Sequence, residues 1–343
     1  MNAEKVKCVI WDLDNTIWEG ILAESDQVTL KDNIKTIIRE LDNRGILQSI
    51  SSKNDYDIAR KKLEEFGLWE YFIYPQISWN PKSQAVQTIA KSINIGSDTL
   101  AFIDDQPFEL EEVQFAYPEV RVIDAERLDK ILDMDCMKPR FLTSDSHNRR
   151  LLYQNDIKRN TVEKEFTGNQ EAFLSSLSMN FIISKAQKSD LQRVEELTVR
   201  THQLNSTGYI YSYDELCDCI TDDKYEVLVT RLDDKYGSYG TIGLALFEKY
   251  ADIWEIKLLI MSCRVMSRGV GNILLNHICN EARQQGVKVR AQFVPTVRNR
   301  IMYITYKFNG FKEIDKNEND VLMLEADMSQ ERSIPTYVNV VVE

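Results

Sequence analysis

The chain has 343 residues, a length that suits two domains better than one. Hydrophobic residues make up 43% and charged residues 28%, which is typical of a globular protein. The net charge of −12 argues against nucleic acid as a partner, because binding a phosphate backbone requires a basic surface. No apolar run approaches the roughly 20 residues that cross a bilayer, so we expect a cytoplasmic protein without membrane contact.

The first part of the chain alternates between strand and helix patterns. Short apolar runs predict five strands, at residues 6–12, 46–51, 71–77, 99–104 and 120–124. Amphipathic helix patterns lie between these runs, with Gly45 as a helix stop and Asn80-Pro81 as a helix start. This alternation predicts an α/β domain over residues 1–130, with a parallel sheet covered by helices.

The remaining chain has a different organisation. Residues 131–176 are polar and helix-prone, which predicts a helical connector. Runs of neighbouring strands between helices then predict an α+β domain over residues 177–330, and residues 331–343 are predicted to be a C-terminal tail.

Two acids directly follow the first predicted strand. In an open parallel sheet, ligands bind beyond the carboxyl ends of the strands, which is where Asp12 and Asp14 fall. Carboxylates this close favour a cation between them, and Mg²⁺ is the natural ion for oxygen ligands. A capped turn without any catalytic role would show the same local pattern.

Three further polar features lie at strand ends or at a helix start, where they could reach the same edge of the predicted sheet. Ser52 lies at the end of the second strand, Lys82 in the first turn of a helix, and Asp104-Asp105 at the end of the TLAFIDD strand. A hydroxyl can bind a phosphoryl oxygen, an ammonium can neutralise its charge, and further carboxylates can hold Mg²⁺. In this order, on successive strand ends, the features predict a site for phosphoryl transfer.

These motifs resemble those of the haloacid dehalogenase superfamily. The resemblance implies a Rossmann-like domain in which Asp12 is the nucleophile, Asp14 is general acid and then base, and Lys82 stabilises charge. It also implies a phosphoryl-binding set, Ser52, Lys53 and Asn54. The implied Mg²⁺ ligands are Asp12, Asp14 through its backbone carbonyl, Asp104 and Asp105. Little chain separates the first two motifs, so no large cap is expected, and the second domain or a protein-borne substrate would cover the site.

In the second domain, arginines and glycines lie where a strand runs into a helix, in the segment MSCRVMSRGVG at 261–271. The segment resembles the pyrophosphate-binding turn of GNAT acetyltransferases, although Ser267 departs from the family pattern. The residues predicted to bind substrate or a pantetheine arm are Cys263, Arg264, Arg268 and Gly269, with Arg200, Gln203 and Asn205 from the RTHQLN segment. A plain helix start and a polar helix cap are the competing interpretations.

Over residues 5–325 the chain resembles FkbH-like proteins of polyketide and related biosynthesis. The resemblance rests on VIWDLDNTIWEG, SSKND, WNPKSQAV, FIDDQPFELEEV, RTHQLNSTG, YGSYGTIG and MSCRVMSRGVG. It implies a phosphatase-like domain followed by a GNAT-like acyltransferase domain. The implied reaction removes phosphate from a phosphorylated three-carbon donor of glyceryl type and passes the acyl group to the phosphopantetheine thiol of an acyl carrier protein, or to coenzyme A.

Two other functions stay open, a simple phosphatase with the second domain as a lid and a non-catalytic scaffold that binds a carrier protein. Ser51 takes the place at which glyceryl-loading members often have cysteine, which argues against thioester chemistry there and leaves Cys263 as the candidate thiol. From Glu255 to Lys312 the chain has ten basic residues against two acids. This local charge suits an acidic or phosphorylated partner, and equally a solvated helix face.

Overall fold

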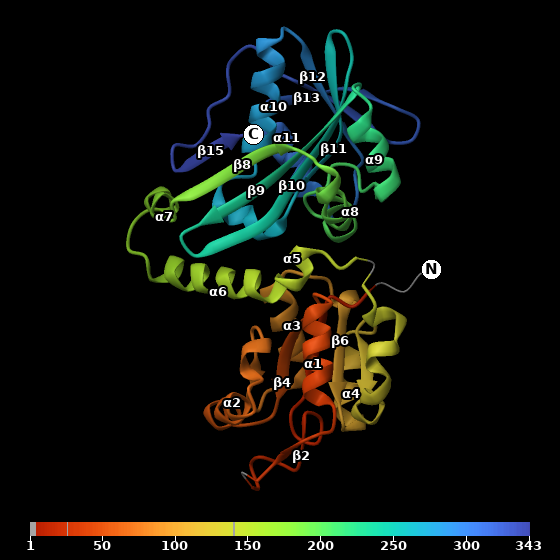
Figure 1. Ribbon diagram of the computed structural model, residues 1–343, viewed down its shortest axis with the longest axis vertical. Coiled ribbons are helices and arrows are strands. Elements are labelled where there is room, and N and C mark those ends of the chain that lie inside the picture. Colours follow the sequence, from red (N-terminus) through yellow and green to blue (C-terminus); the bar gives the residue numbers. More distant parts are fainter. Residues whose placement is uncertain (1–4, 26, 140) are drawn as a thin grey trace. The chain divides into compact units, whose positions relative to one another are not determined.

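The computed structural model describes residues 5–25, 27–139 and 141–343 (Figure 1). The chain forms two compact units, Met1–Gln154 and Asn155–Glu343, and each has its own large sheet. The boundary between them falls inside helix α6 (Arg149–Glu165). The sequence-based limits at 130, 176 and 330 stay predictions. Within the described residues, no helix is both long and apolar enough to cross a lipid bilayer.

The first unit contains a five-stranded sheet whose neighbouring strands are all parallel. In spatial order the strands are β5 (Gln76–Ile77), β4 (Leu47–Ser52), β1 (Cys8–Trp11), β6 (Leu100–Asp104) and β7 (Arg121–Asp124). Its α-helices are α1 (Ile34–Asn43), α2 (Tyr56–Glu65), α3 (Lys82–Ile93), α4 (Pro107–Ala116) and α5 (Ser144–His147). Short 3₁₀ helices are η1 (Trp69–Tyr71), η2 (Ser97–Thr99), η3 (Ala125–Asp133) and η4 (Asp135–Met137). This alternation confirms the predicted α/β class.

Burial explains why these segments adopt strand and helix. Every residue of β1 and β4 is buried, as expected of central strands covered on both faces. α1 buries four apolar residues at the spacing of one helix face, Ile34, Ile37, Ile38 and Leu41. The Asp55 side chain starts α2 by accepting two backbone hydrogen bonds, from the first turn of the helix.

Between β1 and α1, the described residues form a small hairpin. Strand β2 (Trp18–Glu19) pairs antiparallel with β3 (Thr29–Leu30), and the hairpin projects away from the main sheet (Figure 1). As expected from the sequence, this short segment leaves no room for a large cap domain between the first two motifs.

The second unit contains an eight-stranded mixed sheet. In spatial order its strands are β13 (Phe311–Lys316), β14 (Leu322–Ala326), β12 (Lys288–Phe293), β11 (Ile253–Met261), β10 (Gly237–Lys249), β9 (Tyr225–Asp234), β8 (Met179–Lys185) and β15 (Val338–Val342). The β11–β12 and β8–β15 pairs are parallel, and the other neighbours are antiparallel. Its helices are α7 (Gln170–Ser176), η5 (Lys188–Asp190), α8 (Leu191–Arg200), α9 (Tyr213–Thr221), η6 (Cys263–Arg268), α10 (Ile273–Gln284) and α11 (Arg300–Phe308).

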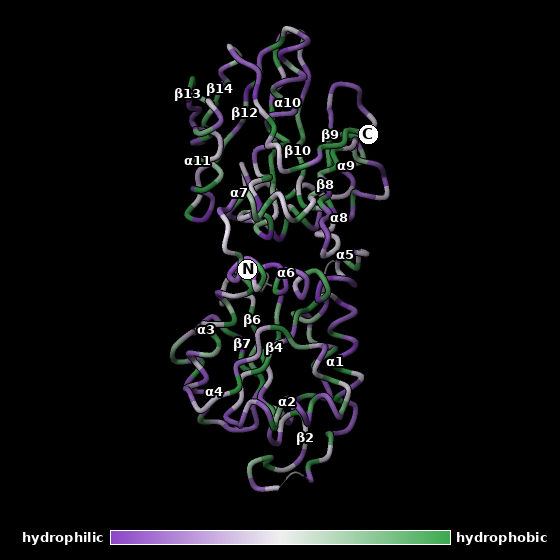
Figure 2. The backbone as a smooth tube through the Cα atoms, turned by 90° about the vertical axis from the view of Figure 1, so that its left-hand side faces the viewer, coloured by the Kyte–Doolittle hydropathy of each residue, from purple (hydrophilic) through white to green (hydrophobic). Residues whose placement is uncertain are grey.

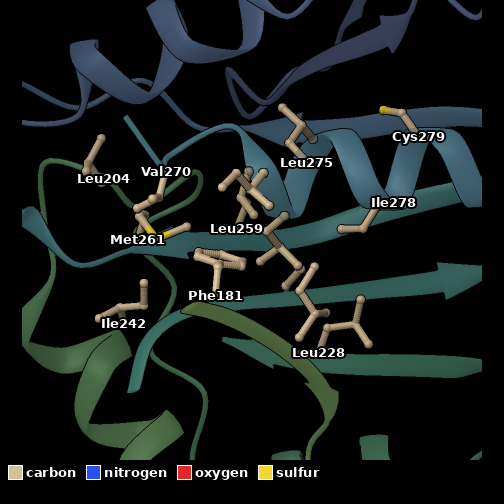
Figure 3. Close-up of a cluster of buried hydrophobic side chains, with 14 of the residues drawn as sticks. Phe181, Leu204, Leu228, Ile242, Leu259, Met261, Val270, Leu275, Ile278 and Cys279 are labelled. Atoms are coloured by element: carbon tan, nitrogen blue, oxygen red, sulfur yellow. The ribbon is translucent and has the colours of Figure 1, made fainter. Parts of the chain in front are cut away.

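Two apolar layers cover the two faces of this sheet. Helices α8 and α9 pack on alternate residues of the central strands, such as Leu244 and Leu258, while α10 and α11 pack on the residues between them, such as Leu259. Figure 3 shows part of the second layer, with Leu275 and Ile278 of α10 lying over the sheet. This period-two alternation is what a sheet between two helix layers requires, and the α+β class predicted for the second domain is confirmed.

The last strand, β15, lies within the range that the sequence analysis describes as a tail. It pairs in parallel with β8, from Val338 opposite Met179 to Val342 opposite Ile183. The C-terminal residues therefore extend the sheet and form one of its edges.

A buried arginine ties α6 to the sheet of the second unit. Arg159 is fully buried and donates two hydrogen bonds to Asp234, at 2.7 and 2.8 Å, and one to the Gly237 carbonyl oxygen at 2.7 Å. Its guanidinium also contacts Asp156 at 2.8 Å and lies 3.7 Å from the ring centre of Tyr239. A charge removed from water this completely depends on every one of these partners.

Asp234→Ala is expected to lower the free energy of unfolding by about 3–5 kcal/mol, because it leaves the Arg159 guanidinium buried without its bidentate partner. Urea unfolding of the full chain, followed by far-UV circular dichroism, measures the change. Lys316→Ala is the control, since it breaks an exposed pair with Asp320 and is expected to leave the midpoint unchanged. Equal midpoints for the two variants would contradict the role given to Arg159.

Candidate active site

Three carboxylates meet where two neighbouring strands of the first unit end. Asp12 directly follows β1, and Asp104 ends β6, which pairs in parallel with β1. One carboxylate oxygen from each of Asp12, Asp104 and Asp105 lies within 4.8 Å of the others. Asp12 and Asp104 are buried, and Asp105 is half-buried. The sheet thus brings together three of the four acids predicted to hold Mg²⁺.

The ammonium group of Lys82 lies among these carboxylates. Helix α3 has Pro81 as its N-cap and Lys82 as its first residue, one position later than the sequence pattern indicates. Lys82 Nζ donates hydrogen bonds to Asp12 Oδ1, to Asp104 Oδ2 at 3.1 Å and to the Ser51 carbonyl oxygen at 2.7 Å. An ammonium has three N–H groups, so all of its donors are used here.

Burial dominates the electrostatics of the cluster. It raises the pKa of Asp12 to about 7, with Lys82 acting in the opposite direction and Asp104 adding to the rise. Burial also raises the pKa of Asp104 and of Asp105. Burial by itself would lower the pKa of Lys82, but the charges of Asp12 and Asp104 outweigh it and raise that pKa. One ammonium does not balance three carboxylates, so the cluster favours a further cation.

The residues present fit a divalent cation with oxygen ligands. Oδ1 of Asp105 is buried and has no hydrogen-bond partner among the described residues, which is costly for a carboxylate oxygen unless a cation binds it. Mg²⁺ prefers carboxylate oxygens, and Asp12, Asp104 and Asp105 are close enough to share one ion. Bound there, Mg²⁺ would withdraw charge from a phosphoryl group. Asp14 is expected to hold the ion through its backbone carbonyl oxygen rather than its carboxylate, and that role stays a prediction.

Asp14 is instead tied to the hairpin and to the loop after β4. Its Oδ1 accepts hydrogen bonds from Trp18 Nε1 at 2.8 Å and from the Leu22 backbone N–H at 3.1 Å. Its Oδ2 accepts from Asn54 Nδ2 at 2.9 Å. All three groups donate to Asp14, so its side chain is fixed in position. Sequence reasoning missed Trp18, which lies four residues after Asp14 and anchors the hairpin to the site.

The predicted phosphoryl-binding residues separate into two groups. Ser52 and Asn54 are buried, and Asn54 Nδ2 lies 3.4 Å from Ser52 Oγ while it also binds Asp14. Lys53 is turned toward another acid, and its Nζ lies 2.7 Å from Glu109 Oε1 of α4. Glu109 is buried, and nothing in FIDDQPFELEEV distinguishes it from the other acids of that helix. Lys53 would have to leave Glu109 before it could bind phosphate.

In the second unit, two residues of the predicted pyrophosphate turn have hydrogen-bond partners elsewhere in the chain. Arg268 is buried and donates to Glu163 Oε2 at 2.7 Å and to Asn160 Oδ1 at 2.8 Å, both on α6. The Tyr337 hydroxyl donates to the Gly269 carbonyl oxygen at 3.2 Å. A side-chain carbon at Gly269, where φ is 67°, would meet that hydroxyl at 2.1 Å. The Arg268 side chain and the Gly269 carbonyl oxygen are therefore engaged within the chain, and anion binding by this turn stays a prediction.

The other predicted substrate contacts of this unit have local partners. Arg264 and Cys263 are half-buried in η6. Arg200 lies 3.9 Å from Glu196 one turn back on α8, and Gln203 is half-buried just beyond that helix. The Asn205 side chain builds a turn by accepting from the backbone N–H groups of residues 207 and 208, at 3.1 and 2.8 Å.

Residues 204–206 fill the place where β11 and β12 separate. The parallel pairing of these strands ends at Ile256 opposite Ala291, beside a β-bulge that leaves Lys257 without a partner on β10. Beyond it, Ser206 N–H donates to the Leu259 carbonyl oxygen at 3.0 Å, and Val294 N–H donates to the Ser206 carbonyl oxygen at 2.9 Å. A cavity of about 490 Å³ adjoins this segment, lined by Thr207, Gly208, Tyr209, Tyr211, Lys257, Gln292 and Val294.

Comparison with known proteins gives matches only among solved structures. No protein-family model matches the chain, and no curated protein matches it. A magnesium-bound phosphatase domain in the N-terminal part of a Bacteroides fragilis protein is 28% identical, with a TM-score of 0.35 over 38% of this chain and 40% of that one. The chain thus spans well under half the length of that structure.

Two acetyltransferase structures are similar to another part of the chain. The ribosomal-protein-S18-alanine N-acetyltransferase of Escherichia coli is 16% identical, with a TM-score of 0.35 over 44% of this chain and 95% of that one. The PaiA N-acetyltransferase of Thermoplasma acidophilum, in complex with coenzyme A, is 18% identical, with a TM-score of 0.35 over 43% of this chain and 98% of that one. These partial likenesses do not assign an activity to this chain.

The affinity for Mg²⁺ is expected to rise as the pH increases from 6 to 8, because the proton that Asp12 holds below a pKa of about 7 competes with the ion. Isothermal titration calorimetry in buffers of different ionisation heat measures the affinity and the proton released. Asp105→Asn is expected to weaken binding by removing an oxygen charge. An affinity that does not change with pH, with no proton released, would contradict this prediction.

Proposed function

We propose that the first unit is a Mg²⁺-dependent phosphohydrolase of haloacid dehalogenase type, with Asp12 as its nucleophile. The observation that carries this proposal is the buried cluster of Asp12, Asp104 and Asp105 around the Lys82 ammonium. Lys82 keeps Asp12 in hydrogen-bonding contact with a positive charge, which favours the ionised carboxylate that a nucleophile needs.

The proposed reaction has two balanced steps. An Asp12 oxygen attacks phosphorus, the bond from phosphorus to the leaving oxygen breaks, and Asp14 gives that oxygen a proton. Asp14 then takes a proton from water, whose oxygen attacks the phosphorus of the aspartyl-phosphate and releases phosphate with Asp12 restored. Asn54, which touches both Asp14 and Ser52, supports this role because it fixes one Asp14 oxygen beside the proposed phosphoryl site.

We further propose the finer activity that the FkbH-like resemblance implies, in which the donor is a phosphorylated three-carbon acyl compound of glyceryl type. The acyl group would pass to the phosphopantetheine thiol of an acyl carrier protein, with coenzyme A as the other possible acceptor. The uncapped sheet and two exposed aromatic side chains beside it, Trp79 and Phe108, support a substrate larger than a free small phosphate ester.

One observation favours the simpler alternative, a phosphatase whose second unit does not transfer acyl groups. Arg268 is paired with Glu163 and Asn160, the Gly269 carbonyl oxygen accepts from Tyr337, and residues 204–206 fill the separation of β11 and β12. A pantetheine arm would have to displace these contacts. The non-catalytic scaffold is the weaker alternative, because Asp12, Lys82 and Asp104 are in mutual contact in the described structure.

The test is to incubate the full chain with Mg²⁺, 1,3-bisphosphoglycerate and a phosphopantetheinylated acyl carrier protein. Phosphate release is measured in solution, and the mass of the intact carrier reports acylation. Both are expected for the leading proposal. Asp12→Asn is expected to reduce phosphate release by at least about 10³-fold, because an amide is not a nucleophile. Asp129→Asn, an exposed change elsewhere in the first unit, is the matched control.

The outcomes separate the three functions. Phosphate release without a mass change on the carrier supports the simple phosphatase, and neither signal supports the scaffold. Near-normal phosphate release by the Asp12→Asn protein would overturn Asp12 as the nucleophile, whichever function holds.

A further inference from the structure

Helix α11 carries an apolar stripe on the side that faces away from the core. Its inner face buries Met302 and Tyr306 in the second apolar layer. The opposite face exposes Ile301, Ile304 and Phe308, whose spacing of three and four residues places them in one row. Phe308 is 86% exposed, which is unusual for a phenylalanine in a soluble fold.

The stripe continues beyond the helix into the preceding loop. Val297, two residues before the Asn299 N-cap, is 100% exposed. Figure 2 shows α11 at one side of the second unit, near β13 and β14. Three exposed apolar side chains in one helical row, with exposed Val297 in the loop before them, exceed the scatter of single apolar residues on an ordinary surface.

Basic side chains border this stripe, and acidic ones are missing from the same stretch of chain. Arg300 and Lys307 are exposed. Arg300 comes four residues before Ile304 and Lys307 three residues after it, so both lie next to Ile304 on the same face of the helix. The sequence from Lys288 to Lys312 contains six basic residues and no Asp or Glu. Two of these, Lys288 and Arg290, pair with Glu325, so Arg300 and Lys307 are the cations that border the stripe itself.

We propose that the α11 stripe, defined as Val297, Arg300, Ile301, Ile304, Lys307 and Phe308, docks the acidic carrier protein of the proposed acyl transfer. This proposal rests on the proposed function and adds where the partner binds. An apolar row beside cations fits a partner surface that has apolar side chains beside carboxylates. The basic border would attract such a partner over distance, and Phe308 and Ile304 would anchor it by burial.

Charge and apolar length distinguish an acidic carrier protein from the two other partners that could cover the α11 stripe, a second copy of this chain and a lipid surface. A second copy of this chain would bring the same basic patch into contact with itself in a twofold dimer, where like charges repel. An anionic lipid surface would satisfy the cations. However, the three exposed apolar helix residues form a short row, and membrane-bound helices of this kind bury a longer apolar face. The acidic carrier protein is therefore the occupant that the sequence and exposure favour.

The experiment measures binding of an acidic phosphopantetheinylated acyl carrier protein to the full chain by fluorescence anisotropy. Phe308→Ala is expected to weaken binding about ten-fold, and the Arg300→Glu/Lys307→Glu pair by at least as much, with a smaller salt dependence. The matched control is Phe115→Ala, which removes an equally exposed phenylalanine from α4 of the first unit and is expected to change nothing. Circular dichroism checks that each variant is folded.

Carrier-independent phosphate release from 1,3-bisphosphoglycerate distinguishes this proposal from the function on which it rests. All variants are expected to release phosphate at the wild-type rate. Wild-type affinity in the α11 variants would overturn the docking surface alone. A wild-type protein that releases phosphate but binds no carrier would overturn acyl transfer and the docking surface together. Loss of dimerisation, or of binding to phosphatidylserine vesicles, in Phe308→Ala without any loss of carrier binding would assign the stripe to that other occupant.

Discussion

The first unit depends on the balance of charge around the Lys82 ammonium. Its three donors bind Asp12, Asp104 and the Ser51 carbonyl oxygen, which belong to three neighbouring parallel strands or directly follow them. This one group therefore links the carboxyl ends of β1, β4 and β6. The same burial that raises the pKa of Asp12 makes its carboxylate costly to ionise, and both Lys82 and a divalent ion would favour the ionised form.

The second unit satisfies its buried cations with its own acids. Arg159 pairs with Asp234 of β9, and Arg268 of η6 pairs with Glu163, so α6 is linked to the sheet and to η6. The second pair uses Arg268, which the sequence resemblance assigns to anion binding. Arg300 and Lys307 of α11, which follows the predicted turn in the sequence, remain exposed.

The sequence predicted the elements that depend on local pattern and missed those that depend on a distant partner. Asp12, Lys82 and Asp104 were predictable as neighbours because parallel strands place their carboxyl ends at one edge. Lys53 pairs with Glu109, and Arg268 pairs with Glu163. These pairs depend on how the helices pack, so they could not be predicted from the spacing of residues in the sequence. The two-residue strands of the hairpin are too short for a period-two signal. β15 is short and apolar, and its pairing is set by a strand some 159 residues earlier.

Anomalous diffraction from crystals grown with Mn²⁺ in place of Mg²⁺ tests the central claim most directly. The account predicts a single strong peak in the first unit, within bonding distance of carboxylate oxygens of Asp12, Asp104 and Asp105, with Lys82 still in contact with Asp12. No peak at that position at saturating Mn²⁺, with the three carboxylates turned apart, would contradict the account.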